Sequence, residues 1–365
     1  MADGPPGWGE PAPFFTAVTD GVSNYSIQVA AGRWMVLMVF GSLGTPACAE
    51  ALERVMQRRA LFDDVDALFF GVTIDPADRL DRGLCNSEPG IRFFWDLDRT
   101  VSQTLGVIDT AYLHPTVFLI DRQFRIAATA PIEAVDAVLD QLAAARQAED
   151  ATAAVAFPPI LIAPRIFEPE FCRTLLDYFA SQTAEESGFA IDVDGRTETH
   201  VAAHLKRRED VGITDATLLD GVMQRLEGRL LPLIQRSFAW RPTDIERFLI
   251  CRYAAGNQGF FSAHRDNVTA GTAHRKFAVS INLNAEGYEG GDIRFPEFSR
   301  QTFRPPTGGA AVFACGLLHE VTPVTVGQRF TLVPFLYDAD GARVRAANAG
   351  RVDGEVAAGR RFAAP

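Results

Sequence analysis

The spacing of apolar residues changes character along the chain. In the first half, a continuous apolar run at residues 34–40 and further strand patterns such as residues 116–121 alternate with stretches in which apolar residues recur at helical spacing. A continuous apolar run is typical of a strand that is covered on both faces of a sheet. Strands that alternate with helices predict an α/β sandwich around a central sheet.

The second half begins with helical spacing and then turns to short strands. Apolar stripes at residues 172–179 and 222–238 predict two helices, the second with a kink at Pro232. From about residue 246 onward, short apolar segments are separated by Gly, Pro and Asn. This pattern predicts a double-sheet β-barrel or jelly roll with supporting helices.

An Ala-rich segment separates the two patterns. Residues 143–159 begin as the end of a helix and close with two prolines, and they offer little that a core could bury. The chain has 365 residues, more than the ~250–300 residues at which a single core stops growing. We therefore predict a first domain over residues 1–150, a second over 151–342 and a loosely ordered tail over 343–365.

The first apolar run leads into a predicted helix with a cysteine near its start. Thr45 suits the N-cap and Pro46 the first helical position, so Cys48 falls in the first turn. There the positive end of the helix dipole and unpaired backbone N–H groups are expected to lower the pKa of a thiol. Cys48 is therefore a candidate reactive thiolate, and the alternative is a small buried residue.

The other cysteines indicate no covalent framework. Five cysteines are an odd number and form no Cys-x-x-Cys pair, so neither a disulfide set nor a structural zinc site is expected. Cys85 lies in a turn-rich segment and is either a resolving partner of Cys48 or a bystander. His114 and Pro115, directly before a predicted strand, are a candidate cis-proline turn.

Candidate metal ligands occur in the β-rich half. His264 and Asp266 are two residues apart, so on an extended strand both side chains point to the same face. His319 follows after enough residues for further strands to return to the same site. Two histidines and one carboxylate form the facial triad of non-haem Fe(II) oxygenases, which leaves coordination positions open.

A candidate anion site follows the second histidine. Arg329 comes after a turn at Gly327, so it can lie on a neighbouring strand that faces the same cavity, and Thr331 shares its facing by the period of two. A guanidinium can pair with a carboxylate through two parallel hydrogen bonds. Iron beside a fixed guanidinium is the arrangement suited to an α-keto acid co-substrate.

Charge and targeting signals narrow the function class. The formal net charge is −11 at pH 7, which argues against a nucleic-acid partner. Residues 1–10 lack the basic and apolar regions of a secretory signal, and residues 34–40 are too few for the ~20 residues that span a bilayer. We expect a cytoplasmic protein without a membrane or nucleic-acid partner.

Residues 158–338 resemble the 2-oxoglutarate/Fe(II)-dependent dioxygenases of the prolyl 4-hydroxylase type. The matching segments are RYAAGNQGFFSAHRDN, SINLN with YEGGDIRFP, and LLHEVTPVTVGQRFTL. The resemblance implies a double-stranded β-helix that holds Fe(II) through His264, Asp266 and His319. It also implies that Arg329 anchors 2-oxoglutarate.

The same resemblance implies further contacts and a reaction. Tyr253 stands at the place of a tyrosine that reaches the 2-oxoglutarate carboxylate in relatives, and Thr331 lines the same site. Relatives convert 2-oxoglutarate and O₂ to succinate and CO₂ while they hydroxylate an unactivated C–H bond, and ascorbate is a candidate additional cofactor. Asn282 replaces a tyrosine of many relatives, which places it near the substrate mouth. Whether the substrate is a protein side chain or a small molecule stays open.

Residues 10–145 resemble thioredoxin-fold proteins of the peroxiredoxin (AhpC/TSA) group. The match rests on the first strand, the segment GSLGTPACAE and the following helix, with Thr45 placed as in the Pro-x-x-x-Thr-x-x-Cys pattern. Gly41 replaces the proline of that pattern, and His114 replaces a common arginine.

The predicted function is therefore an Fe(II)- and 2-oxoglutarate-dependent dioxygenase with a thioredoxin-like domain. One alternative is a thiol peroxidase that acts through Cys48, with the β-rich domain as a scaffold. Another is an N-terminal domain that recognises the substrate. The oligomeric state stays open.

Overall fold

The computed structural model describes residues 4–86, 89–109, 112–151, 157–352 and 359–362. It divides into two compact units. Unit 1 comprises Met1–Phe157 with Pro296–Ser299, and unit 2 comprises Pro158–Phe295 with Arg300–Pro365. Part of the predicted Ala-rich junction, residues 152–156, lies outside the described residues.

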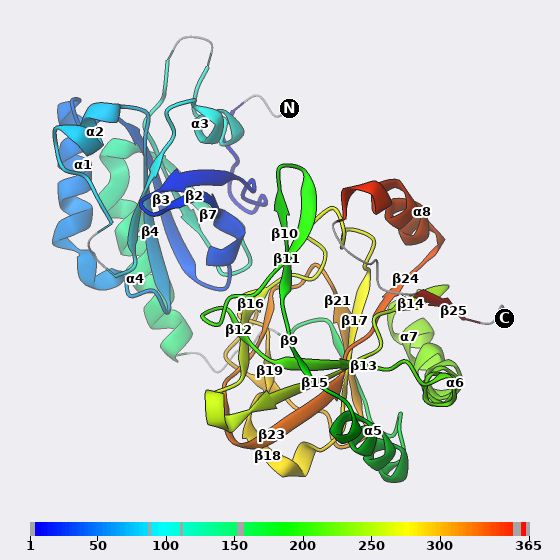
Figure 1. The fold of residues 1–365 in the computed structure, drawn as a ribbon. Coiled ribbons are helices and arrows are strands. Elements are labelled where there is room, and N and C mark those ends of the chain that lie inside the picture. Colours follow the sequence, from blue (N-terminus) through cyan, green and yellow to red (C-terminus); the bar gives the residue numbers. More distant parts are fainter. Residues whose placement is uncertain (1–3, 87–88, 110–111, 152–156, 353–358, 363–365) are drawn as a thin grey trace. The chain divides into compact units, whose positions relative to one another are not determined.

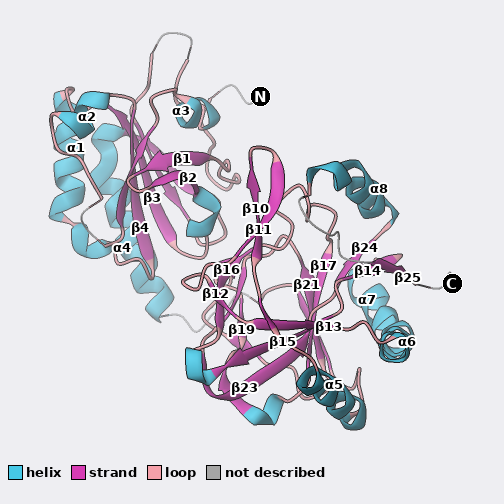
Figure 2. Cartoon of the chain, in the orientation of Figure 1, coloured by secondary structure: helices cyan, strands magenta, loops and turns pink. Residues whose placement is uncertain are grey.

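Unit 1 is built on a five-stranded sheet in the order β5-β4-β3-β6-β7 (Figures 1 and 2). These strands are β3 (Trp34–Gly41), β4 (Ala67–Thr73), β5 (Ile91–Trp95), β6 (Thr116–Ile120) and β7 (Ile126–Pro131). A separate hairpin comprises β1 (Thr16–Thr19) and β2 (Val22–Ser26). The helices are α1 (Pro46–Gln57), α2 (Pro76–Leu80), α3 (Thr100–Thr104) and α4 (Val135–Ala151).

The central strands of unit 1 are buried throughout. β3 and β4 pair in parallel, and β6 joins β3 in antiparallel orientation. Val55 of α1 and Leu139 of α4 are fully buried against this sheet in one apolar cluster. The predicted α/β sandwich is thus confirmed. Burial on both faces explains why β3 and β4 read as continuous apolar runs.

Unit 2 contains two sheets. The main sheet comprises β8 (Ile160–Ala163), β9 (Glu185–Glu186), β13 (Glu209–Gly212), β14 (Asp244–Glu246), β15 (Leu249–Ala254), β17 (Phe277–Asn282), β18 (Tyr288–Gly290), β21 (Ala310–Ala314), β23 (Val324–Leu332), β24 (Phe335–Tyr337) and β25 (Gly359–Arg361). The minor sheet comprises β12 (Lys206–Arg207), β16 (Phe260–His264), β19 (Ile293–Arg294), β20 (Thr302–Phe303) and β22 (His319–Val321). A hairpin is formed by β10 (Phe189–Val193) and β11 (Arg196–His200).

The two sheets of unit 2 enclose an interior. Cys251 and Tyr253 of the main sheet and Val321 of the minor sheet belong to one buried cluster. This sheet-on-sheet arrangement confirms the predicted jelly roll.

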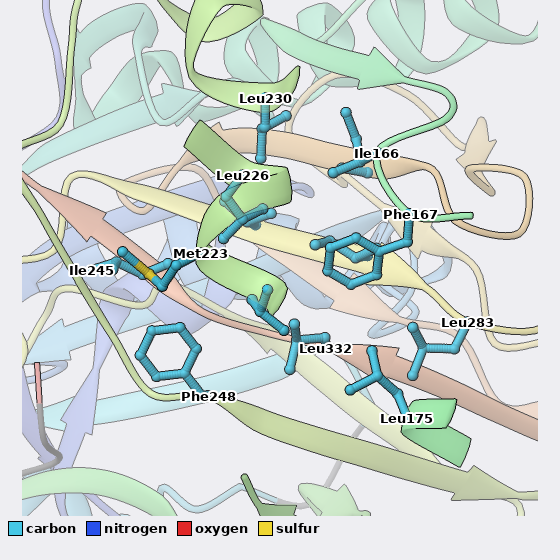
Figure 3. Close-up of a cluster of buried hydrophobic side chains, with 14 of the residues drawn as sticks. Ile166, Phe167, Leu175, Met223, Leu226, Leu230, Ile245, Phe248, Leu283 and Leu332 are labelled. Atoms are coloured by element: carbon cyan, nitrogen blue, oxygen red, sulfur yellow. The ribbon is translucent and has the colours of Figure 1, made fainter. Parts of the chain in front are cut away.

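Helices cover the main sheet on the side away from that interior. They are α5 (Pro169–Ser181), α6 (Ala216–Arg225), a π-helical segment (Leu226–Leu230) and α7 (Leu231–Phe238). Leu226 and Leu230 are fully buried, and Figure 3 shows them in a cluster with Leu332 of β23. The irregularity predicted at Pro232 takes the form of the π-helical segment directly before it, since proline lacks the N–H that a regular helix needs.

Two local expectations differ from the structure. Residues assigned to a loose tail form part of helix α8 (Ala339–Asn348), where Asp338 caps the N-terminus by accepting from Gly341 N at 2.9 Å. Strand β25 pairs with β14, while residues 353–358 and 363–365 lie outside the described range. No described peptide bond is cis, so the cis prediction for His114–Pro115 is wrong. No helix among the described residues is long and apolar enough to cross a membrane.

Candidate functional site

Three side chains with metal-binding atoms meet at the minor sheet. His264 ends β16, and His319 begins β22 directly opposite it in the antiparallel register. Asp266 follows just beyond β16, where its backbone N–H donates to Cys315 O at 3.0 Å. The ligand atoms of His264, Asp266 and His319 all lie within 4.8 Å of one another. The structure thus brings together the three residues that the sequence singled out.

Hydrogen bonds orient both imidazoles. Nδ1 of His264 lies 2.7 Å from Ser262 O, and Nδ1 of His319 lies 3.0 Å from Leu317 O. Because a carbonyl can only accept, each Nδ1 carries a proton, so Nε2 is the ring nitrogen available to a metal. These Nε2 atoms lie 3.6 Å and 3.3 Å from the two carboxylate oxygens of Asp266.

The surroundings set the charge states of these groups. Burial and the neighbouring His264 lower the pKa of His319 to about 4, so its imidazole is neutral at pH 7. Burial raises the pKa of Asp266, but His319 and His264 outweigh it and hold that pKa well below its usual range. Two imidazoles and a carboxylate are the donor set of a non-haem Fe(II) site, so the residues fit this metal.

Apolar rings surround the same group. The Phe261 ring stacks on His264 with centroids 3.5 Å apart, and the Phe313 ring meets His319 edge to face at 4.6 Å. These contacts restrict rotation of the imidazoles and exclude water from one side of each.

Arg329 lies on the inner face of the main sheet with an incomplete set of partners. It is 3% exposed, and Nη2 donates to Ser280 Oγ at 3.1 Å. Nε and Nη1 are buried without a hydrogen-bond partner among the described residues. A buried guanidinium with unpaired donors is costly, so this geometry suits a bound carboxylate.

Thr331 and Tyr253 flank Arg329 within the sheet. Thr331 Oγ1 donates to Ile281 O at 2.9 Å and lies 2.9 Å from Ser280 Oγ, so it supports the serine that holds Arg329. Tyr253 lies opposite Arg329 in the register of β15 and β23 and is 2% exposed. Sequence reasoning missed Ser280, because only the pairing of β17 with β23 places it there.

A glycine sets the path of the strand that carries Arg329. Gly327 has φ +70°, and a Cβ there would lie 2.1 Å from Gly287 O. Only glycine fits this crossing of β18 and β23 without moving the backbone.

The side chain of Asn282 is buried and hydrogen-bonded within unit 2. It is 1% exposed and its Nδ2 donates to Tyr288 Oη at 2.7 Å and to Pro305 O at 2.9 Å. Asn282 also lies opposite Thr331 in the register of β17 and β23, two residues from Arg329 along β23, and its place at the substrate mouth stays a prediction.

The candidate thiol site of unit 1 also differs from expectation. Cys48 is 1% exposed in the first turn of α1, and burial, followed by Glu133 and Asp78, raises the pKa of its thiol. The predicted lowering is wrong because burial and two carboxylates oppose the helix dipole. Thr45 is the N-cap residue but makes no side-chain cap hydrogen bond. Cys85 is exposed, and both cysteines are free.

Buried polar groups beside α1 are bonded to each other. The carboxylate of Asp78, which is fully buried, accepts from Leu43 N at 3.1 Å, Thr73 Oγ1 at 2.5 Å and Arg82 Nη1 at 2.8 Å. His114, at the place of the arginine of relatives, is exposed and lies 3.0 Å from Asp109.

One known family matches a segment of each unit. Residues 248–337 match the model of the 2OG-Fe(II) oxygenase superfamily, and residues 8–129 match that of the AhpC/TSA family. Unit 2 thus contains a 2OG-Fe(II) oxygenase domain, and unit 1 contains an AhpC/TSA domain with a thioredoxin-like fold. This class implies Fe(II), 2-oxoglutarate and O₂.

Individual relatives point to the hydroxylases of this class. The chain is 29% identical to a PKHD-type hydroxylase of Thioalkalivibrio sulfidiphilus over 42% of this chain and 71% of that protein. It is 26% identical to a PKHD-type hydroxylase of Hyphomonas neptunium over 40% and 67%. The structure is similar to that of a Pseudomonas putida prolyl-4-hydroxylase, with 16% identity, a TM-score of 0.38, and coverage of 50% of this chain and 93% of that chain.

Proposed function

We propose that unit 2 holds Fe(II) through His264 Nε2, the Asp266 carboxylate and His319 Nε2, and binds 2-oxoglutarate on Arg329. The observation that supports this most directly is the convergence of the three ligand atoms within 4.8 Å in a fold where Arg329 keeps buried, unpaired donors. When bound, the iron and 2-oxoglutarate supply the oxidising chemistry, in which O₂ delivers one oxygen atom to succinate and the other to a C–H bond, with release of CO₂.

The residues of the chain orient and shield this chemistry. The carbonyls of Ser262 and Leu317 fix the imidazoles, so that both Nε2 atoms would face a bound metal. Arg329 pairs with the distal carboxylate of 2-oxoglutarate and thereby sets the position of its keto-acid end. Phe261 and Phe313 keep one side of the ligands dry.

The substrate is proposed as a protein side chain or a small molecule with an unactivated C–H bond. Ascorbate is proposed as the reductant that keeps the iron ferrous. Five free cysteines fit a reducing compartment, which supports the cytoplasm as the location. The domain boundary is proposed between residue 150 and Pro158, where the second compact unit begins.

A thiol peroxidase has no support from the geometry of Cys48, because its thiol is buried and its pKa is raised. Recognition of the substrate stays the alternative role for unit 1.

The proposed function is tested by release of succinate from 2-oxoglutarate in the presence of Fe(II). The wild-type chain should release succinate, and His319→Ala should reduce the rate by about 10³-fold or more, because one of the metal ligands is lost. The matched control is His200→Ala, which removes an exposed histidine that contacts Glu198. Turnover that survives His319→Ala would sink the assignment.

A further inference from the structure

A row of side chains crosses three strands inside unit 2. Tyr253 of β15 lies opposite Arg329 of β23, and Asp210 of β13 lies opposite Cys251 of β15. Continuing the antiparallel register of β13 and β15 by two residues brings Arg208 beside Tyr253. Arg208, Tyr253 and Arg329 therefore form one cross-strand row on the interior face.

Arg208 is held firmly in this row. It is 6% exposed, and Nη2 donates to Asp210 Oδ2 at 2.7 Å and to Ser187 Oγ at 2.9 Å. Its other terminal nitrogen, Nη1, donates to the Tyr253 hydroxyl oxygen at 3.5 Å. The guanidinium thus joins a fixed carboxylate on one side to the tyrosine on the other.

This contact decides which way the Tyr253 hydroxyl points. Arg208 can only donate, so the tyrosine oxygen accepts from it and its own hydrogen must point elsewhere. Among the described residues, no acceptor for that hydrogen is found. Burial raises the pKa of Tyr253, so the hydroxyl keeps its hydrogen at pH 7. A buried O–H without an acceptor calls for a ligand atom.

The unused donors gather around one ring. The Arg329 guanidinium carbon lies 5.3 Å from the Tyr253 ring centroid, and that of Arg208 lies 5.9 Å from it. Arg329 contributes two unpaired nitrogens and Tyr253 one unpaired hydroxyl hydrogen. A carboxylate has two acceptor oxygens and about four lone-pair positions, so it can satisfy this set of donors.

We propose that Arg208 is a positioning residue for the co-substrate: it holds the Tyr253 hydroxyl so that its hydrogen points to the carboxylate that Arg329 binds. This inference rests on the proposed function. Asp210 and Ser187 fix the guanidinium, and Arg208 acts through Tyr253 without touching the ligand itself. The second positive charge also favours a dicarboxylic keto acid over a monocarboxylic one.

The test compares 2-oxoglutarate with 2-oxobutyrate, which lacks the distal carboxylate. Dissociation constants are measured by calorimetry on the full chain loaded with Mn(II), so no turnover is needed. Arg208→Met should weaken 2-oxoglutarate binding about tenfold and leave 2-oxobutyrate binding unchanged. The double variant Arg208→Met with Tyr253→Phe should bind no more weakly than Tyr253→Phe alone, because both changes remove one interaction.

Two further variants separate positioning from folding. Arg208→Lys keeps the charge but cannot reach Asp210 and Tyr253 together, so it should lose several-fold of the preference for 2-oxoglutarate. Arg252→Met is the matched control, because Arg252 lies on the opposite face of β15 and contacts Glu209. Its binding of both keto acids should equal that of the wild type.

The outcomes are distinct. Equal weakening of both keto acids by Arg208→Met, full retention of the preference in Arg208→Lys, or simple additivity in the double variant would overturn the positioning role alone. A wild-type chain that shows no preference for 2-oxoglutarate over 2-oxobutyrate would contradict the proposed role of Arg329, and the positioning role with it.

Discussion

The two units each bury a polar centre, and the centres differ in whether their hydrogen-bonding groups are already paired. In unit 1, Asp78 accepts from Leu43 N, Thr73 and Arg82, and its carboxylate is fully used. In unit 2, Arg329 has one partner, Ser280, and two buried nitrogens without one. Both centres contain chemically capable residue types, but only the second leaves donors for a ligand.

Residue type alone does not decide whether a side chain can react or bind, because its environment sets its pKa and its free hydrogen-bonding groups. A cysteine at a helix start and a His-x-Asp pair are both suggestive in a sequence. Burial turned Cys48 into a thiol with a raised pKa, whereas burial kept His319 neutral and therefore able to bind a metal. Burial thus makes the thiol of Cys48 less reactive, whereas it leaves the imidazole of His319 available as a metal ligand.

The largest expected effect comes from removing the unpaired donors. Arg329→Met should raise the KM for 2-oxoglutarate by about 100-fold and change kcat less, because a charged bidentate contact to the co-substrate is lost. Initial rates of succinate release against 2-oxoglutarate concentration measure this. Arg173→Met, an exposed residue paired with Glu170, is the control. An unchanged KM would show that the unpaired donors of Arg329 do not bind 2-oxoglutarate.

A second prediction concerns Glu246, a buried carboxylate of unit 2 whose ion pairs are expected to stabilise the fold. Glu246 has a 2% exposed side chain, and its oxygens lie 3.0 Å from His274 Nε2 and 2.8 Å from Arg275 Nε. Burial raises its pKa, but His274 and Arg275 outweigh this and lower it from 4.5 to about 2. Glu246→Gln should lower the free energy of unfolding at pH 7 by about 3 kcal/mol.

The acid dependence of this effect has a defined sign. Because the folded pKa is lowered, the contribution of Glu246 is fully present above pH 4.5 and is lost as the pH falls toward 2. Calorimetry at several pH values should therefore show a flatter acid slope for Glu246→Gln. Glu289→Gln, an exposed position, should retain the wild-type slope. Equal slopes for all three chains would rule out this role of Glu246.

The smallest effect is expected at the first centre. Cys48→Ser should leave hydrogen peroxide consumption at the background level of the wild type, since the raised pKa lowers the thiolate fraction at pH 7. In alkylation at pH 7 followed by mass spectrometry, exposed Cys85 should react well before Cys48. A Cys85→Ser chain checks that the early product is correctly assigned. Rapid labelling of Cys48 would instead restore the peroxidase alternative.

The fold class could be predicted because strands that are buried on both faces appear in the sequence as runs of apolar residues. β3 and β4 are covered on both faces, and their sequences are apolar except for Thr73 at the end of β4. Details of turns and chain ends were harder to predict from the sequence. The bond before Pro115 is trans, the form that most X–Pro bonds take, and helix α8 begins after Asp338, a local cap that the prediction of a loose tail did not use.

In the site, too, residues close in the sequence could be predicted, whereas residues brought together by strand pairing could not. The spacing of His264 and Asp266 suggested a shared face on one strand, yet β16 ends at His264, and its pairing with β22 is irregular between Phe261 and His264. The side chains meet all the same, by a turn that sequence did not foresee. Ser280 and Arg208 were missed because they become relevant only through strand pairing.

The row of Arg208, Tyr253 and Arg329 has a consequence for folding kinetics. Arg208 and Tyr253 are 45 residues apart in the chain, and Arg329 joins them from a third strand. Contacts between distant segments form late, because the entropy of loop closure must be overcome first. The proposed co-substrate pocket therefore requires all three strands to be in register, and 2-oxoglutarate bound there would stabilise only molecules that have reached this state.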